Sequence, residues 1–429
     1  MMKLLYSTKS SPDAIRTRYG TEYGEVEAVV ERILRDVREN GDAALYKYSL
    51  QFDHADLSCF AVTRTEIEEA VKNTDPAFLA TLTQAAENIR AFHQKQVRQG
   101  FVMSEREGVM LGQRILPLDR VGLYIPGGTA SYPSTVLMNA IPAKIAGVKQ
   151  IVLTTPPAPD GSIASPILAA AYVAGVDNIY KVGGAQAIAA LAYGTKSIPR
   201  VDKITGPGNM YVATAKRKVY GLTDIDMVAG PSEILIIADD SADPFFVAAD
   251  LLSQAEHDAM AASILLTESE LLAKAVQSEV ERQLALIPRR EIAEKSILSH
   301  GRIVVMRSLA EAVEWSNVIA PEHLELCVSD PFALLGLVKH AGSVFLGHYA
   351  PEALGDYFAG PNHTLPTNGT ARFASPLSVD DFIKKSSFIY YTKEALGQVK
   401  AQVADFARRE GLNAHEKSIT IRFDGSDEE

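Results

Sequence analysis

The stretch ILIIADDSADPFFVAADLLSQAEHDAMAASILLT, residues 234–267, decides the fold. It begins and ends with short apolar runs, at 234–237 and 264–267, and a helical segment lies between them. Two buried strands joined through a helix are typical of a parallel pair, because the helix carries the chain back to the edge where the first strand began. The stretch therefore predicts one repeat of a parallel, helix-covered sheet.

The same alternation continues on both sides of this stretch. Apolar runs follow at 303–306, 324–328 and 344–346, and an earlier series of runs ends before Gly230 and Pro231. Alanine-rich helical stretches separate the earlier runs, which predicts a second parallel sheet covered by helices. We therefore expect two α/β domains. The earlier runs are 121–125, 151–154, 179–182 and 201–204.

The first hundred or so residues are expected to be mainly helical. Residues 25–40 carry apolar side chains at helical spacing, and Gly41 follows them as a C-terminal stop. This spacing predicts an amphipathic helix that buries one face. The apolar positions are Val26, Val29, Val30, Ile33, Leu34 and Val37.

Composition limits the class of protein. The chain is 47% hydrophobic, which is ample for a large core. Its 429 residues are too many for one ordinary domain. Neither a signal peptide nor an apolar run of ~18 to 20 residues is present, so we expect a cytoplasmic protein without a membrane partner. A net charge of −11 argues against a nucleic-acid partner. Cys59 and Cys327 are too few for a disulfide framework or a thiolate zinc site, so the expected ligand is small and any metal needs nitrogen and oxygen ligands.

The segment LLSQAEHD, residues 251–258, ends a helix that Ser241 could cap. On this helix Asp250, Gln254 and His257 fall at i, i+4 and i+7, which places Gln254 and His257 about 5 to 6 Å apart at Cβ. Two ligands of one metal ion would suit this geometry. A solvated helix end has the same spacing, so the spacing alone leaves both interpretations open.

Further ligands would have to come from distant parts of the sequence. Asp356 and His363 lie in GDYFAGPNHT, a Gly- and Pro-rich segment that is expected to be a loop, and His415 lies near the C-terminus. Two imidazoles, one carboxylate and one amide oxygen would suit Zn²⁺.

The segment APEHLEL, residues 320–326, places Glu322 beside His323. Neighbours in a strand or helix diverge, so both side chains reach one substrate only if this segment is a turn, which Pro321 favours. A carboxylate beside an imidazole offers two proton acceptors for a reaction with two proton-removing steps. A surface charge pair is the alternative.

Three glycine-rich segments follow predicted strands, at 124–128, 183–187 and 206–209. Each could let a ligand approach the backbone at the carboxyl edge of a parallel sheet. None is a dinucleotide fingerprint, because Tyr211 occupies the third glycine position after Gly206. From these residues alone, ordinary tight turns are the favoured interpretation.

Four motifs in this order resemble the histidinol dehydrogenase family. They are AGPSE at 229–233, QAEH at 254–257, PEHLE at 321–325 and GPNHTLPT at 360–367, and EGLNAHEKS at 410–418 follows them. The resemblance covers nearly the whole chain. It implies the four-electron oxidation of L-histidinol to L-histidine through the aldehyde, with two NAD per turnover and one zinc ion per subunit.

The resemblance also implies a role for individual residues. His323 would be the base for both hydride transfers, and Glu322 would activate the water that hydrates the aldehyde. His363 is expected near the site without a defined role. The implied zinc ligands are Gln254, His257, Asp356 and His415. The implied substrate contacts are these four with Ser232, His323 and Glu410, and the implied NAD contacts are Tyr124, Gln186 and Asn209.

The expected fold is α/β, with two Rossmann-like parallel-sheet domains that are incomplete and lack GxGxxG, a helical N-terminal part and a C-terminal dimerisation tail. The resemblance implies a homodimer with shared active sites, in which Glu410 and His415 complete the site of the other subunit. We expect an N-terminal arm at 1–24, a discontinuous first domain at 25–117 and 231–378, an NAD-contacting domain at 118–230, and the tail at 379–429.

Three alternatives remain at this point. A related zinc and NAD dehydrogenase could act on another small polar alcohol, such as a sulfonated diol, but the Glu322 and His323 pair with Glu410 and His415 argues against it. A zinc hydrolase would also use a metal beside a glutamate, but it would leave Tyr124, Gln186 and Asn209 without a purpose. A non-catalytic scaffold would be expected to have lost a proton-transfer residue.

Overall fold

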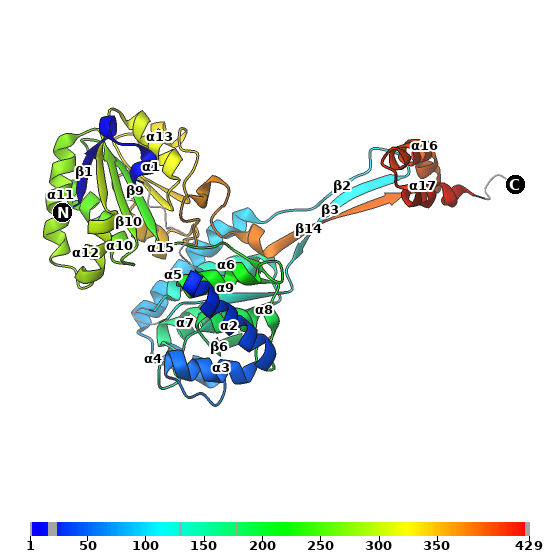
Figure 1. The fold of residues 1–429 in the computed structure, drawn as a ribbon, viewed down its shortest axis with the longest axis horizontal. Helices are drawn as coiled ribbons and strands as arrows, with labels where there is room; N and C mark the ends of the chain where they lie inside the picture. The colour runs from blue at the N-terminus through cyan, green and yellow to red at the C-terminus, as the bar shows by residue number, and fades with distance from the viewer. Residues whose placement is uncertain (1, 16–23, 128–130, 177, 425–429) are drawn as a thin grey trace. The chain divides into compact units, whose positions relative to one another are not determined.

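The chain divides into two units in the computed structural model. The first unit comprises Met1–Val97 and Leu118–Phe382, and the second comprises Arg98–Pro117 and Ile383–Glu429. The first unit contains two parallel sheets with helices on both faces, and the second contains an antiparallel sheet and helices (Figure 1). The predicted α/β class with two parallel sheets is confirmed. The structure describes residues 2–15, 24–127, 131–176 and 178–424.

The first sheet has six parallel strands in the order β1-β11-β10-β9-β12-β13. Residues 234–267 form β9, α10 and β10, and the two strands pair in parallel as predicted. The strand order reverses between β9 and β12, as in Rossmann-like sheets. The strands are β1 Lys3–Tyr6, β9 Glu233–Ala238, β10 Ala262–Thr267, β11 Arg302–Val305, β12 His323–Cys327 and β13 Ser343–Leu346.

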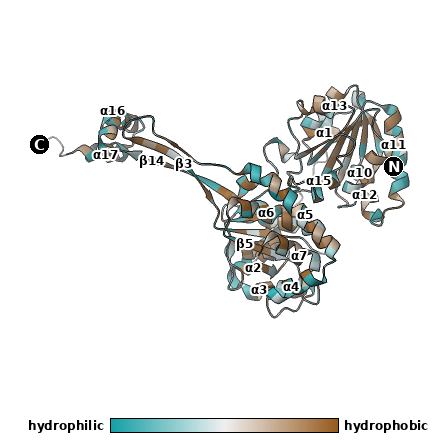
Figure 2. Ribbon diagram, turned by 180° about the vertical axis from the view of Figure 1, so that it is seen from behind, coloured by the Kyte–Doolittle hydropathy of each residue, from teal (hydrophilic) through white to brown (hydrophobic). Residues whose placement is uncertain are grey.

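Helices cover both faces of the first sheet. Ile234 and Ile236 belong to the core beneath α10, α11 and α12, whereas Leu235 and Ile237 belong to the core beneath α1 and α13. Because neighbouring strand residues point to opposite faces, β9 is buried on both sides and is apolar from Ile234 to Ala238. Figure 2 shows the strands of the first sheet mostly in the brown of hydrophobic residues. The helices are α1 Pro12–Ile15, α10 Pro244–Ala255, α11 Glu270–Leu284, α12 Arg290–His300, α13 Leu309–Ile319, α14 Pro331–Leu335 and α15 Glu352–Tyr357.

The second sheet has five parallel strands in the order β6-β5-β4-β7-β8. Its order reverses between β4 and β7, so it has the same topology as the five strands β11-β10-β9-β12-β13 of the first sheet. The strands are β4 Arg120–Tyr124, β5 Gln150–Thr155, β6 Asn178–Lys181, β7 Lys203–Thr205 and β8 Asp224–Ile225. Its helices are α2 Gly24–Asn40, α3 Asp42–Tyr48, α4 Arg64–Asn73, α5 Pro76–His93, α6 Pro133–Ala146, α7 Ser165–Ala174, α8 Gly184–Tyr193 and α9 Met210–Val219.

The packing differs from the expected domain division. Helices α2 to α5 pack on the second sheet, in two cores shared with α6, α7, α8 and α9, and not on the first sheet as the grouping of 25–117 with 231–378 implies. The apolar stripe of α2 is present as predicted, but a stripe does not specify which sheet it covers. Lys3–Tyr6, in the expected arm at 1–24, is an edge strand of the first sheet. The rest of that arm, and the turn at 124–128, fall partly outside the described residues.

The second unit joins two distant parts of the sequence. Strand β14 pairs antiparallel with β3 along its whole length, so the expected tail at 379–429 shares its sheet with residues that precede the second parallel sheet. None of the described helices combines the length with the apolar character that a membrane-spanning helix needs. The elements are β2 Phe101–Met103, β3 Val109–Pro117, β14 Ile383–Tyr391, α16 Lys393–Arg409 and α17 Asn413–Thr420.

Short turns complete the structure. They are the 3₁₀ helices Ser7–Lys9, Gln94–Gln96, Thr370–Arg372, Val379–Phe382 and Ile421–Phe423, and the π-helix Ser49–Asp53.

Candidate active site

Helix α10 begins two residues later than predicted. Asp243 is the N-cap, because its side chain accepts a hydrogen bond from the backbone N–H of Phe245, and Pro244 occupies the first turn. The prediction that Ser241 caps this helix is wrong, since its hydroxyl donates to Asp239 instead. Proline at the first helical position makes the residue before it the cap.

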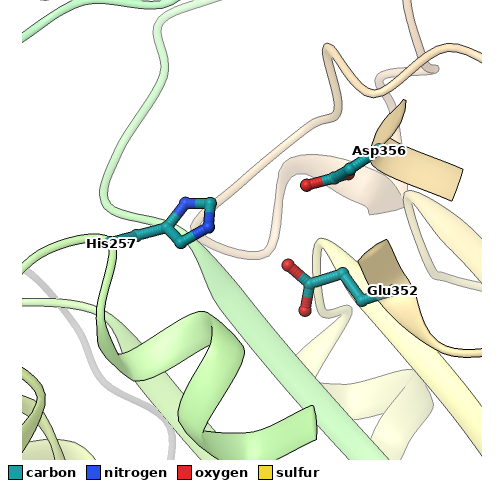
Figure 3. A group of neighbouring side chains, drawn as sticks. All are labelled: His257, Glu352 and Asp356. Atoms are coloured by element: carbon teal, nitrogen blue, oxygen red, sulfur yellow. The ribbon is translucent and has the colours of Figure 1, made fainter. Parts of the chain in front are cut away.

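His257, Glu352 and Asp356 form a group that could hold a metal ion (Figure 3). One potential ligand atom from each residue lies within 4.8 Å of the others. Glu352 and Asp356 both belong to α15 and, as residues at i and i+4, lie on one face of this helix. His257 follows the end of α10. An imidazole nitrogen with carboxylate oxygens is a donor set that fits Zn²⁺.

Gln254 lies beside this group and is fully buried. Its hydrogen-bonding partners assign the amide nitrogen to the Glu352 side, where it donates to the two carboxylate oxygens at 2.6 and 2.7 Å. In this orientation the amide oxygen faces away from Glu352. The structure therefore brings Gln254, His257 and Asp356 together. Glu352 was missed in the sequence, although its position four residues before Asp356 is a helical signal for a shared face.

Glu322 and His323 lie where β12 begins. Ala320 adopts a left-handed conformation with a φ of 54°, so a turn precedes the strand, as the interpretation of this segment required. Glu322 Oε2 accepts a hydrogen bond from the backbone N–H of Glu233 at 2.9 Å and lies 3.8 Å from His323 Nδ1. The two neighbouring side chains therefore converge, and both are buried.

His323 connects this pair with the metal-binding group. Its Nε2 is 3.6 Å from Asp356 Oδ1, and its Nδ1 is 3.9 Å from Glu352 Oε1. Nδ1 also lies 3.2 Å from the backbone carbonyl oxygen of Glu233. Since a carbonyl oxygen can only accept, this pairing assigns the proton to Nδ1 and leaves Nε2 to exchange one. Within the described part of the chain, Nε2 has no hydrogen-bond partner.

Burial and charge shift the pKa values of this pair. Burial raises the pKa of Glu322 to about 7, against the opposing effects of His323 and of hydrogen bonds from the Glu233 backbone and Ser232. Burial lowers the pKa of His323, but the negative charges of Glu352 and Glu322 outweigh it and raise this pKa well above its usual range. The pair thus lies in a surplus of negative charge, which favours binding of a cation.

The site lies at the amino ends of β9 and β12. Ser232 immediately precedes β9, next to Glu233, whose backbone N–H donates to Glu322. His363 lies close by, as expected, with Nδ1 2.9 Å from the backbone carbonyl oxygen of Asp356 and Nε2 3.4 Å from Thr135 Oγ1. In open parallel sheets the ligand usually binds at the carboxyl edge, so this site uses the opposite edge of its sheet.

The carboxyl edge of the second sheet holds a cavity of about 800 Å³. Tyr124, Gln186 and Asn209, the three residues expected to contact NAD, all line it. The Tyr124 hydroxyl accepts a hydrogen bond from the backbone N–H of Gly184 at 3.1 Å, which fixes the ring beside the start of α8. The volume falls within the range of small-molecule and cofactor sites.

The glycine turn after β7 needs its glycine. Gly206 has a φ of 114°, and a Cβ atom there would lie 2.1 Å from the backbone oxygen of Tyr124. Lys216 donates to the Gly206 carbonyl oxygen at 2.9 Å and pairs with the buried carboxylate of Asp226, which accepts the Gly206 N–H at 2.8 Å. Asn209 then caps α9. The close approach explains the glycine-rich segment better than an ordinary turn does.

The remaining two expected contacts belong to the second unit. Glu410 follows the end of α16, and His415 lies in α17. Both are exposed on that unit. They do not take part in the contacts described above.

Comparisons with known proteins identify the family of this chain. A sequence model of the family "Histidinol dehydrogenase" matches residues 16–423. Histidinol dehydrogenase from Listeria monocytogenes is 56% identical over 400 residues, which are 93% of each chain. Histidinol dehydrogenase from Clostridium acetobutylicum is 52% identical over 410 residues, which are 96% of this chain and 95% of that one.

A solved structure supports the same assignment. The crystal structure of histidinol dehydrogenase from Elizabethkingia anophelis is similar to this chain with a TM-score of 0.93 and 40% identity, over 99% of each chain. The sequence model and these relatives span nearly the whole polypeptide, including both units. The chain belongs to the histidinol dehydrogenase family.

Proposed function

We propose that this protein oxidises L-histidinol to L-histidine through L-histidinaldehyde, with transfer of two hydrides to two molecules of NAD, at the final step of histidine biosynthesis. The observation that carries the proposal is the metal-binding group of His257, Glu352 and Asp356 beside the buried pair of Glu322 and His323. A chain of this family with that constellation has the groups for metal binding and for two proton transfers.

The zinc site would use Gln254, His257 and Asp356 of one chain and His415 of the partner subunit. When bound, zinc would supply a positive charge that orients the nitrogen atoms of the substrate and offsets the carboxylates around His323. Gln254 contacts Glu352, which lies with His257 and Asp356 in one group, and this proximity supports a metal site formed by Gln254, His257 and Asp356.

His323 would act as the base in both oxidations. The positive charge of bound zinc would counter the carboxylates that raise the pKa of His323, so that its Nε2 is unprotonated and takes the hydroxyl proton of L-histidinol while the carbon-bound hydrogen leaves as hydride, which forms the aldehyde. The Nδ1–H bond to the Glu233 carbonyl oxygen holds the ring in the tautomer that this role needs. Glu322 then removes a proton from the water that adds to the aldehyde, while Nε2 gives the proton it holds to the aldehyde oxygen. The freed Nε2 takes the hydroxyl proton of the hydrate as the second hydride leaves.

The cavity on the second sheet would hold NAD, which accepts the hydride when bound. Tyr124, Gln186 and Asn209 line it, and their backbone surroundings include the start of α8 and of α9. Asp53 is the sole charged side chain among the described residues that line the cavity, and burial raises its pKa to about 6. A carboxylate of this kind can accept a hydrogen bond from a hydroxyl group of NAD and repels the extra phosphate of NADP.

A second copy of this chain would cover the second unit. Phe101, Ile389 and Phe406 expose 52%, 76% and 70% of their surface there, which is more than apolar side chains usually expose in a monomer. Such a homodimer would let Glu410 and His415 reach the site of the partner subunit. Each active site would then be shared.

The purified protein should convert L-histidinol and NAD into L-histidine, and kcat/KM with NADP should be lower by about 100-fold, because like charges placed together cost several kcal/mol. Asp53→Asn should reduce that preference. Chromatography of the products and the absorbance of the reduced cofactor measure both effects. A protein that forms no L-histidine contradicts the function, whereas equal use of NADP contradicts only the role of Asp53.

A further inference from the structure

Glu352 belongs to the group with His257 and Asp356 but is not among the four proposed zinc ligands, and it is buried beside the catalytic pair. It exposes 2% of its surface, and its backbone N–H donates to Glu325 Oε1 at 2.7 Å, which fixes the start of α15 against β12. Its side chain is directed toward His257 and Asp356 (Figure 3). The position is therefore well ordered by the fold.

The side chain of Glu352 makes its shortest contacts with Gln254. The two carboxylate oxygens accept from the same amide nitrogen at 2.6 and 2.7 Å. A carboxylate can only accept hydrogen bonds, whereas a glutamine amide carries a donor nitrogen and an acceptor oxygen of nearly equal shape. Glu352 therefore selects one of the two orientations of the Gln254 amide, the one in which the oxygen faces away from it.

That choice matters because only one end of an amide can ligate a metal ion. The oxygen has lone pairs to donate, and the nitrogen carries two hydrogens. Gln254 is fully buried, so bulk water does not compete with Glu352 for the amide nitrogen. Residues that hold a ligand in its binding orientation contribute to metal affinity without touching the metal.

We propose that Glu352 is a positioning residue, which holds the Gln254 amide with its oxygen toward the metal and is not itself a zinc ligand. The inference rests on the proposed zinc site. It assigns Glu352 a function that acts entirely through Gln254, and this dependence distinguishes it from direct metal binding.

The test is the dissociation constant of zinc, measured on metal-free full-length protein by competition with a chelator. Glu352→Asp keeps the charge but shortens the side chain, so it should lose the paired contact and weaken zinc binding by about tenfold. In a Gln254→Leu background, Glu352→Asp should cause no further weakening, because its route to the metal has been removed. Glu311→Asp shortens a buried glutamate on α13 and should leave zinc affinity unchanged.

Three other outcomes would overturn the positioning role of Glu352. Unchanged zinc affinity in Glu352→Asp, with wild-type protein that binds zinc, overturns the positioning role and leaves the zinc site standing. A further loss in the Gln254→Leu background overturns it too, because Glu352 would then bind the metal directly. Wild-type protein that binds no zinc overturns both the zinc site and this inference. Thermal melting of each variant verifies that the fold is intact.

Discussion

Glu322→Gln should permit oxidation of L-histidinol to the aldehyde but reduce formation of L-histidine by about 10²- to 10⁴-fold, the usual contribution of a general base. Glutamine has the same shape and can still accept the hydrogen bond that Glu233 N–H donates to Glu322 Oε2 at 2.9 Å. It cannot take a proton from water, so hydration of the aldehyde should fail. His323 remains available for the first oxidation.

The measurement is the yield of aldehyde and of acid from L-histidinol, with an aldehyde-trapping reagent present or absent. Trapped aldehyde should accumulate in Glu322→Gln and not in the wild type. Glu311→Gln makes the same change at a buried glutamate outside the site and should behave as wild type. Unimpaired L-histidine formation by Glu322→Gln would remove Glu322 from the mechanism.

His257→Ala and His415→Ala should each abolish activity, and heterodimers of the two variants should recover about half of the wild-type activity. His257 lies at the metal-binding group of the first unit, whereas His415 lies in α17 of the second. If α17 serves the partner subunit, one site of the heterodimer lacks both histidines and the other has both. One of the two sites in each heterodimer is therefore complete, which gives about half of the wild-type activity.

Co-expression with two different affinity tags isolates the heterodimers, and the rate of NADH formation per dimer gives the result. Mixed homodimers that have not exchanged chains are the control and should stay inactive. If the two histidines instead served the site of their own chain, every site in the heterodimer would lack one ligand. Inactive heterodimers of verified composition would therefore contradict the shared site.

Much of the fold could be predicted because buried strands and helices have distinct patterns. Residues 234–267 form the strand, helix and strand that their apolar runs predict, and the apolar face of α2 is buried as predicted. The pairing of β3 with β14 could not be predicted, since every strand of the two parallel sheets except β1 lies between them in the sequence. Which sheet a helix covers depends on such distant contacts, and helical spacing does not contain them.

The residues of the candidate site, too, could be predicted only in part. Gln254 and His257 were found because local spacing places them on one face, and Pro321 indicated the turn that lets Glu322 and His323 converge. Glu352 was missed because its importance depends on a contact with Gln254, about a hundred residues earlier. The cavity of Tyr124, Gln186 and Asn209 has no dinucleotide fingerprint, so its residues were assigned from family resemblance.

The most direct test of the central claim is the number of NADH molecules formed for each L-histidinol consumed, compared between chelator-treated and zinc-restored protein. The proposed function predicts two NADH with zinc and almost none without it, because both hydrides leave from a substrate held at the metal site. One NADH per L-histidinol would contradict the second oxidation and the role of Glu322. No NADH in zinc-restored protein would contradict the function itself.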